Sequence, residues 1–472
     1  MYLHELYELT DGTLCGDAAF TGICDRAECV RKGDLYVCLE GAHVDGHDYA
    51  GDAVAAGAAA VLCARRLALD VPQLVVPNTR RAIAVASAHF WGVDQMELCL
   101  VGVTGTNGKT TTAYMLRRIF ALAGKPSAYV GTLGVVADHL LMPPTLTTPD
   151  PTVLMPLLAS LYERGVRYVF LEVSAHAAYW HKVDGLKFRA MIFTNLTEDH
   201  LDFFADMESY AAAKASLFCP SRTALGVVNV DDPMGRTLAR NHDLPVLTYG
   251  LQNPADVFAV NVREDVAGVH YVINAYDVLC KVDTCLHGTF NVYNALAATT
   301  VCGYLGVDLR YVAGALRDVD IPGRFHVVEV GGVHMVVDYA HTPDGLRQSL
   351  QAARKMTEGK LTVVFGCGGD REHAKRREMG RIAEQLADVV VLTNDNPRSE
   401  SPEGIVRDIE AGMLTEEGRL VVMDRAEAIR AAYRLSKAGD CVLIAGKGAE
   451  TTMEMGGRKV PYSDYAVLED LS

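Results

Sequence analysis

A glycine-rich stretch at residues 105–111 has the residue types that hold phosphate, in the order G-T-N-G-K-T-T. Its glycines let backbone N–H groups approach phosphate oxygens, Lys109 has the reach to contact the β- and γ-phosphates, and the Thr110 hydroxyl is a ligand for Mg2+. An apolar run precedes the stretch and a helical pattern follows it, the order that opens a parallel nucleotide-binding sheet. The generic Walker spacing has a glycine where this chain has Val103, so a glycine-rich turn with a chance lysine is the alternative.

Polar side chains also follow two further predicted strands of the same sheet. Residues 171–176 read L-E-V-S-A-H, and residues 194–202 read T-N-L-T-E-D-H-L-D. Ligands of open α/β sheets bind outside the carboxyl ends of the strands, so we expect Glu172 and His200 at one rim, as ligands of a second Mg2+. Each residue alone is better explained as a helix cap or part of a solvated loop. Two such clusters near a phosphate loop favour a site.

The last third of the chain has four more polar clusters at predicted strand ends. They are residues 338–344, 366–371, 395–398 and 446–450. Carboxylates and cations recur in them, which suits a zwitterionic amino acid, because arginine pairs with its carboxylate and Asp or Glu with its ammonium group. A structural network of ion pairs is the alternative explanation for any single pair.

Three units are predicted to position these residues. Residues 1–97 alternate short apolar runs with a helical segment at 47–56, which predicts a small α/β N-terminal domain. Residues 98–322 predict a central P-loop-type, doubly wound parallel sheet with a β-rich insertion at 256–285. A Pro-Gly break precedes residues 323–472, which predict a C-terminal Rossmann-like domain. The expected fold class is therefore α/β with three domains.

The composition excludes several classes of protein. The chain has 472 residues, a formal net charge of -15 and no basic tract, so we expect no nucleic acid partner. Its 12 cysteines include no C-x-x-C pair, which favours free thiols in a reducing compartment over zinc ligands or disulfides. The N-terminus lacks a signal-peptide pattern and no apolar run is long enough to span a membrane. We therefore expect a soluble, cytoplasmic protein with no membrane partner.

Nearly the whole chain resembles the Mur ligases, which add amino acids to the UDP-N-acetylmuramoyl peptide of the bacterial cell-wall precursor. Among them it looks like the MurE type, which adds the third residue of the peptide. The resemblance rests on motifs in all three predicted domains. They are G-D-L at 33–35, D-G-H-D at 45–48, the phosphate loop, T-T-P-D at 147–150, G-T-F-N-V-Y-N-A at 288–295, P-G-R-F at 322–325 and D-Y-A-H-T-P-D-G-L at 338–346.

The resemblance implies a reaction. ATP phosphorylates the free carboxylate of a D-glutamyl residue, the amine of the incoming amino acid attacks the acylphosphate, and phosphate leaves from a tetrahedral intermediate. ATP would be held from both sides of a hinge between the second and third domains, so the site would be complete only when these domains close. The residues implied for ATP are Gly105, Thr106, Asn107, Gly108, Lys109, Thr110, Thr111, Asn294, Arg324, Asp338 and His341.

The resemblance also implies a catalytic set and two Mg2+ ions. Lys109 and Thr110 would hold the phosphates and the first ion, while Glu172 and His200 would bind the second. Lys214 matches a lysine that is carboxylated by CO2 in the family and supports that ion; taken alone, it is a helix-surface lysine. We expect a monomer. The residues implied for the UDP-muramoyl peptide are Thr147, Thr148, Ser174 and Lys182.

The motif D-N-P-R at 395–398 is similar to that of MurE enzymes that add meso-diaminopimelate, whereas lysine-adding relatives differ at its last position. Diaminopimelate has a second carboxylate at its far end, for which Arg398 offers a planar fork, but the ammonium group of lysine would be repelled. The expected partners are therefore UDP-N-acetylmuramoyl dipeptide and meso-diaminopimelate. The residues implied for the amino acid are Arg371, Asp395, Asn396, Arg398, Gly446 and Glu450.

Several positions depart from the family pattern. The usual Asp-Ser-Arg before the G-D-L strand reads R-A-E at 26–28, the usual second serine is Ala175, a usual arginine is Lys182 and a usual histidine is Ala449. These changes affect the sugar-nucleotide site and one wall of the amino-acid pocket. A paralogue with an altered acceptor is therefore an alternative.

Other functions stay open at this point. A lysine-adding enzyme is disfavoured by Arg398, and a folylpolyglutamate or cyanophycin synthetase should lack the D-N-P-R motif. A P-loop motor or switch NTPase should have a switch motif after the loop. A non-catalytic nucleotide-binding scaffold is disfavoured by the joint presence of Lys109, Thr110, Glu172, His200 and Lys214.

Overall fold

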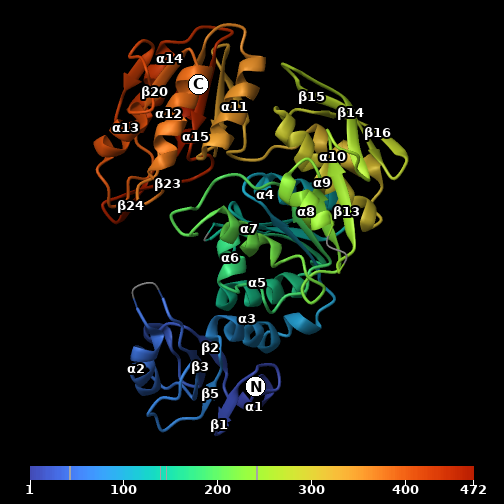
Figure 1. Ribbon diagram of the computed structural model, residues 1–472, viewed down its shortest axis with the longest axis vertical. Coiled ribbons are helices and arrows are strands. Elements are labelled where there is room, and N and C mark those ends of the chain that lie inside the picture. The colour runs from blue at the N-terminus through green and yellow to red at the C-terminus, as the bar shows by residue number, and fades with distance from the viewer. Residues whose placement is uncertain (42–43, 139, 145, 241–242, 472) are drawn as a thin grey trace.

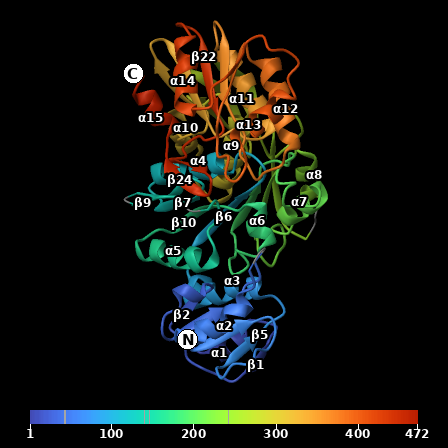
Figure 2. The same cartoon turned by 90° about the vertical axis from the view of Figure 1, so that its left-hand side faces the viewer.

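The computed structural model describes residues 1–41, 44–138, 140–144, 146–240 and 243–471. Three units, each built around its own β-sheet, are stacked along the long axis of the molecule (Figures 1 and 2). Within the described ranges, no helix combines the length and the apolar character needed to cross a membrane. All 12 cysteines are free thiols, and Cys29 and Cys285 are exposed.

The N-terminal sheet has the strand order β1-β5-β4-β3-β2, in which only β1 is antiparallel to its neighbour. Helices α1 and α3 pack on one face and α2 on the other. The helix predicted at 47–56 is split into a 3-10 turn and α2, because the Asp45 side chain accepts the N–H of His47 and starts the turn. The elements are α1 (Leu3–Tyr7), β1 (Thr13–Cys15), β2 (Gly22–Cys24), the 3-10 turns Ala27–Cys29, Gly46–Tyr49 and Val93–Gln95, β3 (Asp34–Val37), α2 (Ala50–Ala55), β4 (Ala60–Cys63), β5 (Gln73–Val75) and α3 (Thr79–Phe90).

The central sheet has the order β16-β15-β14-β13-β12-β11-β6-β10-β7-β8-β9. The strands from β14 to β7 in this order are parallel, which confirms the doubly wound parallel core. Antiparallel strands extend the sheet at both ends. Strands β14–β16 coincide with the predicted β-rich insertion at 256–285, whereas β8 and β9 were not predicted. The elements are β6 (Cys99–Thr104), α4 (Lys109–Leu122), β7 (Ser127–Gly131), β8 (Gly134–Ala137), β9 (Leu140–Met142), α5 (Pro151–Glu163), β10 (Tyr168–Glu172), α6 (Ala175–Tyr179), β11 (Ala190–Phe193), α7 (Met207–Ala215), β12 (Gly226–Asn229), α8 (Pro233–Ala239), β13 (Val246–Gly250), β14 (Val257–Asp265), β15 (Gly268–Ala275), β16 (Val278–Thr284), α9 (Thr289–Tyr304) and α10 (Leu309–Arg317).

Two apolar cores sandwich the central sheet. Side chains of α4, α9 and α10 form one core, and side chains of α5, α6 and α8 form the other. Strand β6 lies in the middle of the parallel strands, and both of its neighbours, β10 and β11, end at the same edge of the sheet as it does. The sheet therefore brings the loops after β6, β10 and β11 together, as expected for a ligand site of an open α/β sheet.

The C-terminal sheet has the order β17-β18-β22-β19-β20-β21, and only β17 is antiparallel. Helices α11, α12 and α13 cover one face, and α14 and α15 the other, which is the predicted Rossmann-like arrangement. The elements are β17 (His326–Val330), β18 (Val333–Asp338), α11 (Pro343–Met356), β19 (Leu361–Phe365), α12 (Ala374–Leu386), β20 (Val389–Leu392), α13 (Pro402–Glu410), β21 (Arg419–Val421), α14 (Arg425–Arg434), β22 (Cys441–Ala445), β23 (Thr452–Met455), β24 (Arg458–Pro461) and α15 (Asp464–Glu469).

Candidate active site

The phosphate loop joins β6 to α4, and two of its glycines have a backbone conformation that other residues rarely adopt. Gly105 has a φ of 145° and Gly108 a φ of 86°. A Cβ atom on Gly105 would lie 1.8 Å from Thr194 Oγ1, and one on Gly108 would lie 2.4 Å from Asn294 Oδ1. Both the backbone conformation and the neighbouring side chains therefore require glycine at these positions.

Two lysines, of which Lys214 is buried and Lys109 partly buried, converge on one carbonyl oxygen of this loop. Lys109 Nζ donates to the oxygens of Gly105 (2.9 Å) and Thr106 (2.8 Å), and Lys214 Nζ donates to the same Gly105 oxygen at 3.0 Å. Burial lowers the pKa of both ammonium groups, and the charge of Lys109 lowers the pKa of Lys214 further. Lys214 also lies 4.1 Å from the centre of the Tyr210 ring. The helix-surface position expected for Lys214 from its sequence context alone is wrong, since the residue is 1% exposed.

Glu172 ends β10 and is fully buried. Its carboxylate accepts hydrogen bonds from the Tyr129 hydroxyl, from the Thr132 N–H (2.9 Å) and from the Thr132 hydroxyl (3.1 Å). Burial, followed by the charge of Glu172, raises the pKa of Tyr129, so this phenol stays a donor. Tyr129 and Thr132 were not predicted as partners of Glu172, because Tyr129 lies within the apolar strand β7 and Thr132 follows it without any recognisable polar motif.

His200 follows β11 and has a positive φ of 59°. Its Nε2 lies 3.3 Å from Asp199 Oδ2, and its ring meets that of His176 edge-on at 4.7 Å. Burial lowers the pKa of His200 to about 3, so at neutral pH the imidazole is uncharged, the form that binds metals. In the described residues, no three His, Cys, Asp or Glu side chains converge as a ready metal cluster. Glu172 and His200 would supply an oxygen and a nitrogen ligand to a metal ion at this rim.

Two residues of the phosphate loop, Asn107 and Thr110, connect it to the C-terminal domain. Arg324 Nη2 donates to the Thr110 hydroxyl at 2.9 Å, and Asn107 Nδ2 donates to Asp344 Oδ2 at 3.2 Å. Asn294 lies on α9, and its Oδ1 accepts the Thr112 hydroxyl at 3.3 Å. The three residues Asn107, Asn294 and Arg324, predicted from the family to bind ATP, therefore lie around one loop.

Asp338 and His341 have other partners, close to the hinge. The Asp338 carboxylate accepts the N–H groups of Phe325 (3.0 Å) and Tyr339 (2.8 Å) and the hydroxyl of Ser349, and burial raises its pKa. His341 Nδ1 donates to the Tyr339 carbonyl at 2.8 Å. Arg324 lies over the Tyr339 ring at 4.2 Å. Asp338 thus connects Phe325, just after the domain boundary, to the end of β18, and its carboxylate oxygens already have protein donors.

The four residues predicted for the acceptor lie near the end of β10. Thr148 Oγ1 donates to the Glu172 carbonyl (2.9 Å) and accepts the Ser174 N–H (3.1 Å). Ser174 caps α6, and Thr147 Oγ1 lies 3.2 Å from Thr132 Oγ1. Lys182 lies after α6, where it pairs with Asp150 at 2.7 Å.

In the C-terminal domain, Asn396 and Glu450 are joined by a lysine whose role the sequence did not indicate. Lys447 Nζ donates to Asn396 Oδ1 (3.0 Å) and to Glu450 Oε2 (2.7 Å), and Asn396 Nδ2 donates to the same Glu450 oxygen at 2.9 Å. Lys447 is fully buried, although it lies in the cluster at 446–450. A Cβ atom on Gly446 would lie 2.3 Å from Asp395 Oδ2, so these two predicted residues are adjacent.

The two arginines predicted for diaminopimelate come from neighbouring loops. Arg398 has a φ of 51°, its Nη1 donates to the Gly369 carbonyl at 2.5 Å and its Nε lies 3.5 Å from Glu454 Oε2. A Cβ atom on Gly368 would lie 3.8 Å from Arg371 Cγ and 2.9 Å from Arg398 Nη1, so both side chains border the same glycine. Arg371 reaches across to the middle domain, where Nη1 pairs with Asp202 at 3.2 Å.

Comparison with known families decides the assignment. Three family profiles match consecutive parts of the chain: Mur ligase family, catalytic domain (residues 20–91), Mur ligase middle domain (103–302) and Mur ligase, glutamate ligase domain (323–448). The chain belongs to the Mur ligase family. Together the matched parts of this Mur ligase include the phosphate loop, Lys214 and the hinge residues.

Individual relatives agree with this assignment. The UDP-N-acetylmuramoyl-L-alanyl-D-glutamate–2,6-diaminopimelate ligase of Geobacillus kaustophilus is 42% identical over 448 residues, which is 93% of this chain and 92% of the relative. The enzyme of the same name from Aquifex aeolicus is 37% identical over 450 residues, 95% of this chain and 93% of the relative. A solved structure of a ligase of that name has a TM-score of 0.70 at 31% identity and covers 96% of this chain and 94% of its own. The MurF ligase of Thermotoga maritima, at 23% identity and a TM-score of 0.65 over 90% of this chain and 93% of its own, shares the fold.

Proposed function

We propose that this Mur ligase is an ATP-dependent, amide-forming enzyme that adds meso-diaminopimelate to the D-glutamyl carboxylate of UDP-N-acetylmuramoyl-L-Ala-D-Glu, a step of peptidoglycan precursor synthesis. The observation that carries the proposal is the 42% identity over 93% of the chain to a ligase of that name. We further propose domain boundaries at 97/98 and 322/323, a monomer, and the cytoplasm as the location, where the nucleotide-linked precursor and ATP are available.

For ATP, we assign the phosphate loop, Asn294, Arg324, Asp338 and His341. Backbone N–H groups of the loop would bind phosphate oxygens, and Lys109 would exchange its two carbonyl partners for the phosphates. Arg324, which donates to the Thr110 hydroxyl, is close enough to the loop to neutralise the negative charge of bound phosphates. Two Mg2+ ions would neutralise the phosphates and the acylphosphate when bound, the first held by Thr110 and the second by Glu172 and His200.

We propose that Lys214 carries a carbamate. Its buried amine has a lowered pKa, which favours the neutral form that attacks CO2. The amine nitrogen forms a bond to the carbon of CO2, one C–O π pair moves to oxygen, and the nitrogen releases a proton. The product is an anion beside Lys109, which would remove the repulsion between the two lysines and supply an oxygen ligand for the second Mg2+.

For the amino acid, we assign Arg371, Asp395, Asn396, Arg398, Gly446 and Glu450, and we add Lys447. Glu450 accepts hydrogen bonds from Lys447 and Asn396, which hold its carboxylate in position to accept a further hydrogen bond from the ammonium group of the substrate. Arg398 uses Nη1 and Nε on protein partners, which leaves Nη2 and the outer edge of its guanidinium for a carboxylate. A lysine substrate lacks that carboxylate, so a lysine-adding enzyme is the less favoured alternative.

Phosphate release from ATP with UDP-N-acetylmuramoyl-L-Ala-D-Glu tests the proposal. Release is expected with meso-diaminopimelate and at most a few per cent of that rate with L-lysine. Equal release with L-lysine would contradict the amino-acid specificity. Absence of release with both amino acids, in protein that still binds ADP, would favour the non-catalytic scaffold.

An altered acceptor is the second candidate, because Ala175, Lys182 and R-A-E at 26–28 depart from the family pattern at the acceptor side. Lys182 keeps a cation there and pairs with Asp150. The same assay with muramoyl dipeptide that lacks the UDP group distinguishes the candidates. A preference for the UDP-linked dipeptide supports the leading proposal, and equal rates would support an altered acceptor.

A further inference from the structure

Glu264, near the end of β14, is a carboxylate that connects three elements. Its side chain is 7% exposed. Oε1 accepts the backbone N–H of Gly288 at 2.6 Å, and Oε2 accepts the ammonium group of Lys355 at 2.8 Å. Gly288 is the N-cap of α9 in the middle domain, whereas Lys355 lies on α11 of the C-terminal domain. One side chain thus joins the β14–β15 hairpin, the start of a long helix and the neighbouring domain.

The contact with Gly288 completes the N-terminus of α9. This residue has a φ of 84° and no side chain, so it cannot cap the helix itself, and a carboxylate next to it stabilises the positive end of the helix dipole. One turn on, Asn291 Nδ2 donates to the His287 carbonyl at 2.8 Å, and Asn294 Nδ2 donates to Asn291 Oδ1 at 3.1 Å. A continuous series of contacts therefore runs from Glu264 to Asn294 at the phosphate loop.

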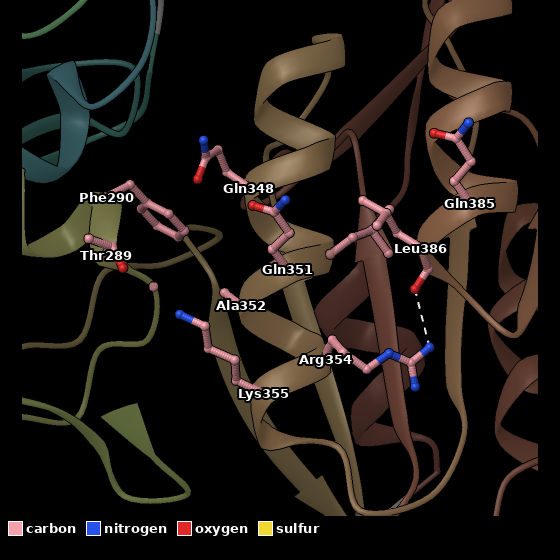
Figure 3. A pocket seen from close by; sticks show the side chains of 11 residues that line it. Thr289, Phe290, Gln348, Gln351, Ala352, Arg354, Lys355, Gln385 and Leu386 are labelled. Atoms are coloured by element: carbon pink, nitrogen blue, oxygen red, sulfur yellow. Dashed lines mark hydrogen bonds between the residues drawn. The ribbon is translucent and has the colours of Figure 1, made fainter. Parts of the chain in front are cut away.

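The contact with Lys355 crosses between domains. Figure 3 shows Lys355 extending from α11 toward the side on which Thr289 and Phe290 begin α9. These residues line a cavity of about 430 Å³ together with Gln348 and Gln351 of α11. Solvent reaches the lysine, which is 52% exposed, while its partner carboxylate is nearly buried. An ion pair at such a site can open without unfolding either domain, since only the lysine has to move into water.

Two polar cross-domain contacts lie next to the active site, whereas the Glu264–Lys355 pair lies apart from it. Asn107–Asp344 and Thr110–Arg324 join the domains at the phosphate loop itself. Lys355 lies three helical turns along α11 from Asp344, because 11 residues of a 3.6-residue helix separate them. The Glu264–Lys355 pair is therefore suited to hold the C-terminal domain at the outer end of the interface.

We propose that Glu264 is a positioning residue that latches the C-terminal domain through Lys355 and, through Gly288 and α9, sets the position of Asn294 at the phosphate loop. This inference rests on the proposed ATP site. Breaking the latch weakens nucleotide binding, because the two domains then have to be ordered by the nucleotide itself. Saturating nucleotide restores the closed arrangement, so kcat changes little.

The test measures the affinity for ADP with Mg2+ by calorimetry, without any amino acid, and KM for ATP and kcat in the complete assay. Lys355→Gln is expected to weaken ADP binding by about threefold, and Glu264→Gln, which also removes the charge at α9, by about tenfold. The kcat value should stay within about twofold of the original protein, and Lys355→Arg should restore binding. The matched control is Lys281→Gln on β16, since Lys281 pairs with Asp283 on the same strand and does not cross between domains.

A double variant and a scattering measurement complete the test. The double variant Glu264→Gln with Lys355→Gln should bind ADP no more weakly than Glu264→Gln alone, because both substitutions remove the same ion pair. Lys355→Glu, which places two carboxylates together, should enlarge the radius of gyration without lowering the unfolding temperature of the domains. Equal ADP affinities of Lys355→Gln and Lys281→Gln, with normal binding by the original protein, would overturn the latch. A failure of the original protein to bind ADP would overturn the proposed function and the latch with it.

Discussion

The phosphate loop and the proposed amino-acid pocket are built in opposite ways. The loop depends on backbone: glycines at 105 and 108 admit no side chain, and Lys109 and Lys214 both donate to the Gly105 carbonyl. The pocket depends on side chains: Arg371 is 44% exposed and Arg398 26% exposed. Each has one ion pair, and Arg398 also donates to the Gly369 carbonyl. A backbone site tolerates almost no substitution, whereas a site of exchangeable charged groups can change its ligand by one residue. This difference would let related ligases share ATP chemistry and differ in the amino acid.

The largest expected effect follows from filling one glycine of the loop. Gly108→Ala is expected to weaken ADP binding and lower kcat/KM for ATP by about 1,000-fold, because the added Cβ would meet Asn294 Oδ1 at 2.4 Å in a left-handed backbone. Gly124→Ala is the matched control, since Gly124 has a φ of 69° but nothing within 4 Å. The control should cost only about 1 kcal/mol of unfolding free energy and leave ADP binding intact. Equal loss of ADP binding in both variants would show that strain alone, and not the contact with Asn294, governs the loop.

Replacement of Lys214 tests the buried lysine of α7 that donates to the phosphate loop. Lys214→Arg keeps a cation but cannot form the carbamate, and kcat is expected to fall by about 100-fold, the size of effect seen when one stabilising group is removed from an active site. The ADP affinity should change much less. Protein incubated with ¹³C-bicarbonate should give a carbamate carbon signal by NMR that the variant lacks. An identical signal in both proteins would contradict the assignment to Lys214.

A conservative change in the pocket should separate amino-acid binding from ATP binding. Arg398→Lys replaces a planar fork with a single ammonium group, so kcat/KM for meso-diaminopimelate is expected to fall by about 30-fold, equivalent to about 2 kcal/mol. The Kd for ADP should stay within about twofold, because Arg398 contacts Gly369 and Glu454 and not the loop. Unchanged use of diaminopimelate by the variant would remove the role given to the guanidinium.

The smallest effect is expected at the acceptor side. Lys182→Arg restores the planar cation usual in the family and keeps the pair with Asp150. KM for the UDP-muramoyl dipeptide is expected to fall by about threefold, since a fork gains at most one extra hydrogen bond at a partly exposed site. A rise in this KM would indicate that the lysine is matched to a different acceptor.

Much of the fold was predictable because its strands are apolar runs bounded by polar turns. Each of the four polar clusters predicted at strand ends in the last third of the chain begins at or shortly after the end of β18, β19, β20 or β22. The antiparallel strands β8 and β9 were not predicted, because they are short and partly exposed. They also follow an alternation of helices and strands, which favours a parallel sheet. The 3-10 turn before α2 was also missed, since its start depends on one Asp45 hydrogen bond.

The candidate site was predictable as a set of residue types but not as a set of contacts. Residues at strand ends, such as Glu172 and His200, follow from topology alone. Their partners do not. Tyr129 and Thr132 donate to Glu172 from β7 and the residue after it, and Lys447 is a buried donor to Asn396 and Glu450 only in the folded chain. Side-chain direction and burial decide these contacts, and neither can be predicted from the spacing of residues in a single sequence. The assigned roles of the site residues remain predictions for the experiments above.

The two exposed thiols offer a means to follow movement of the N-terminal unit relative to the middle unit. Cys29 lies in the N-terminal unit and Cys285 just after β16 of the middle unit, while the other ten cysteines are buried or partly covered. Burial raises the pKa of Cys285, and its Sγ donates to the Val319 carbonyl at 3.4 Å, so this thiol should react slowly with alkylating dyes. Sequential labelling, with the second dye added at higher pH, would then place two different fluorophores on two domains without any engineered cysteine.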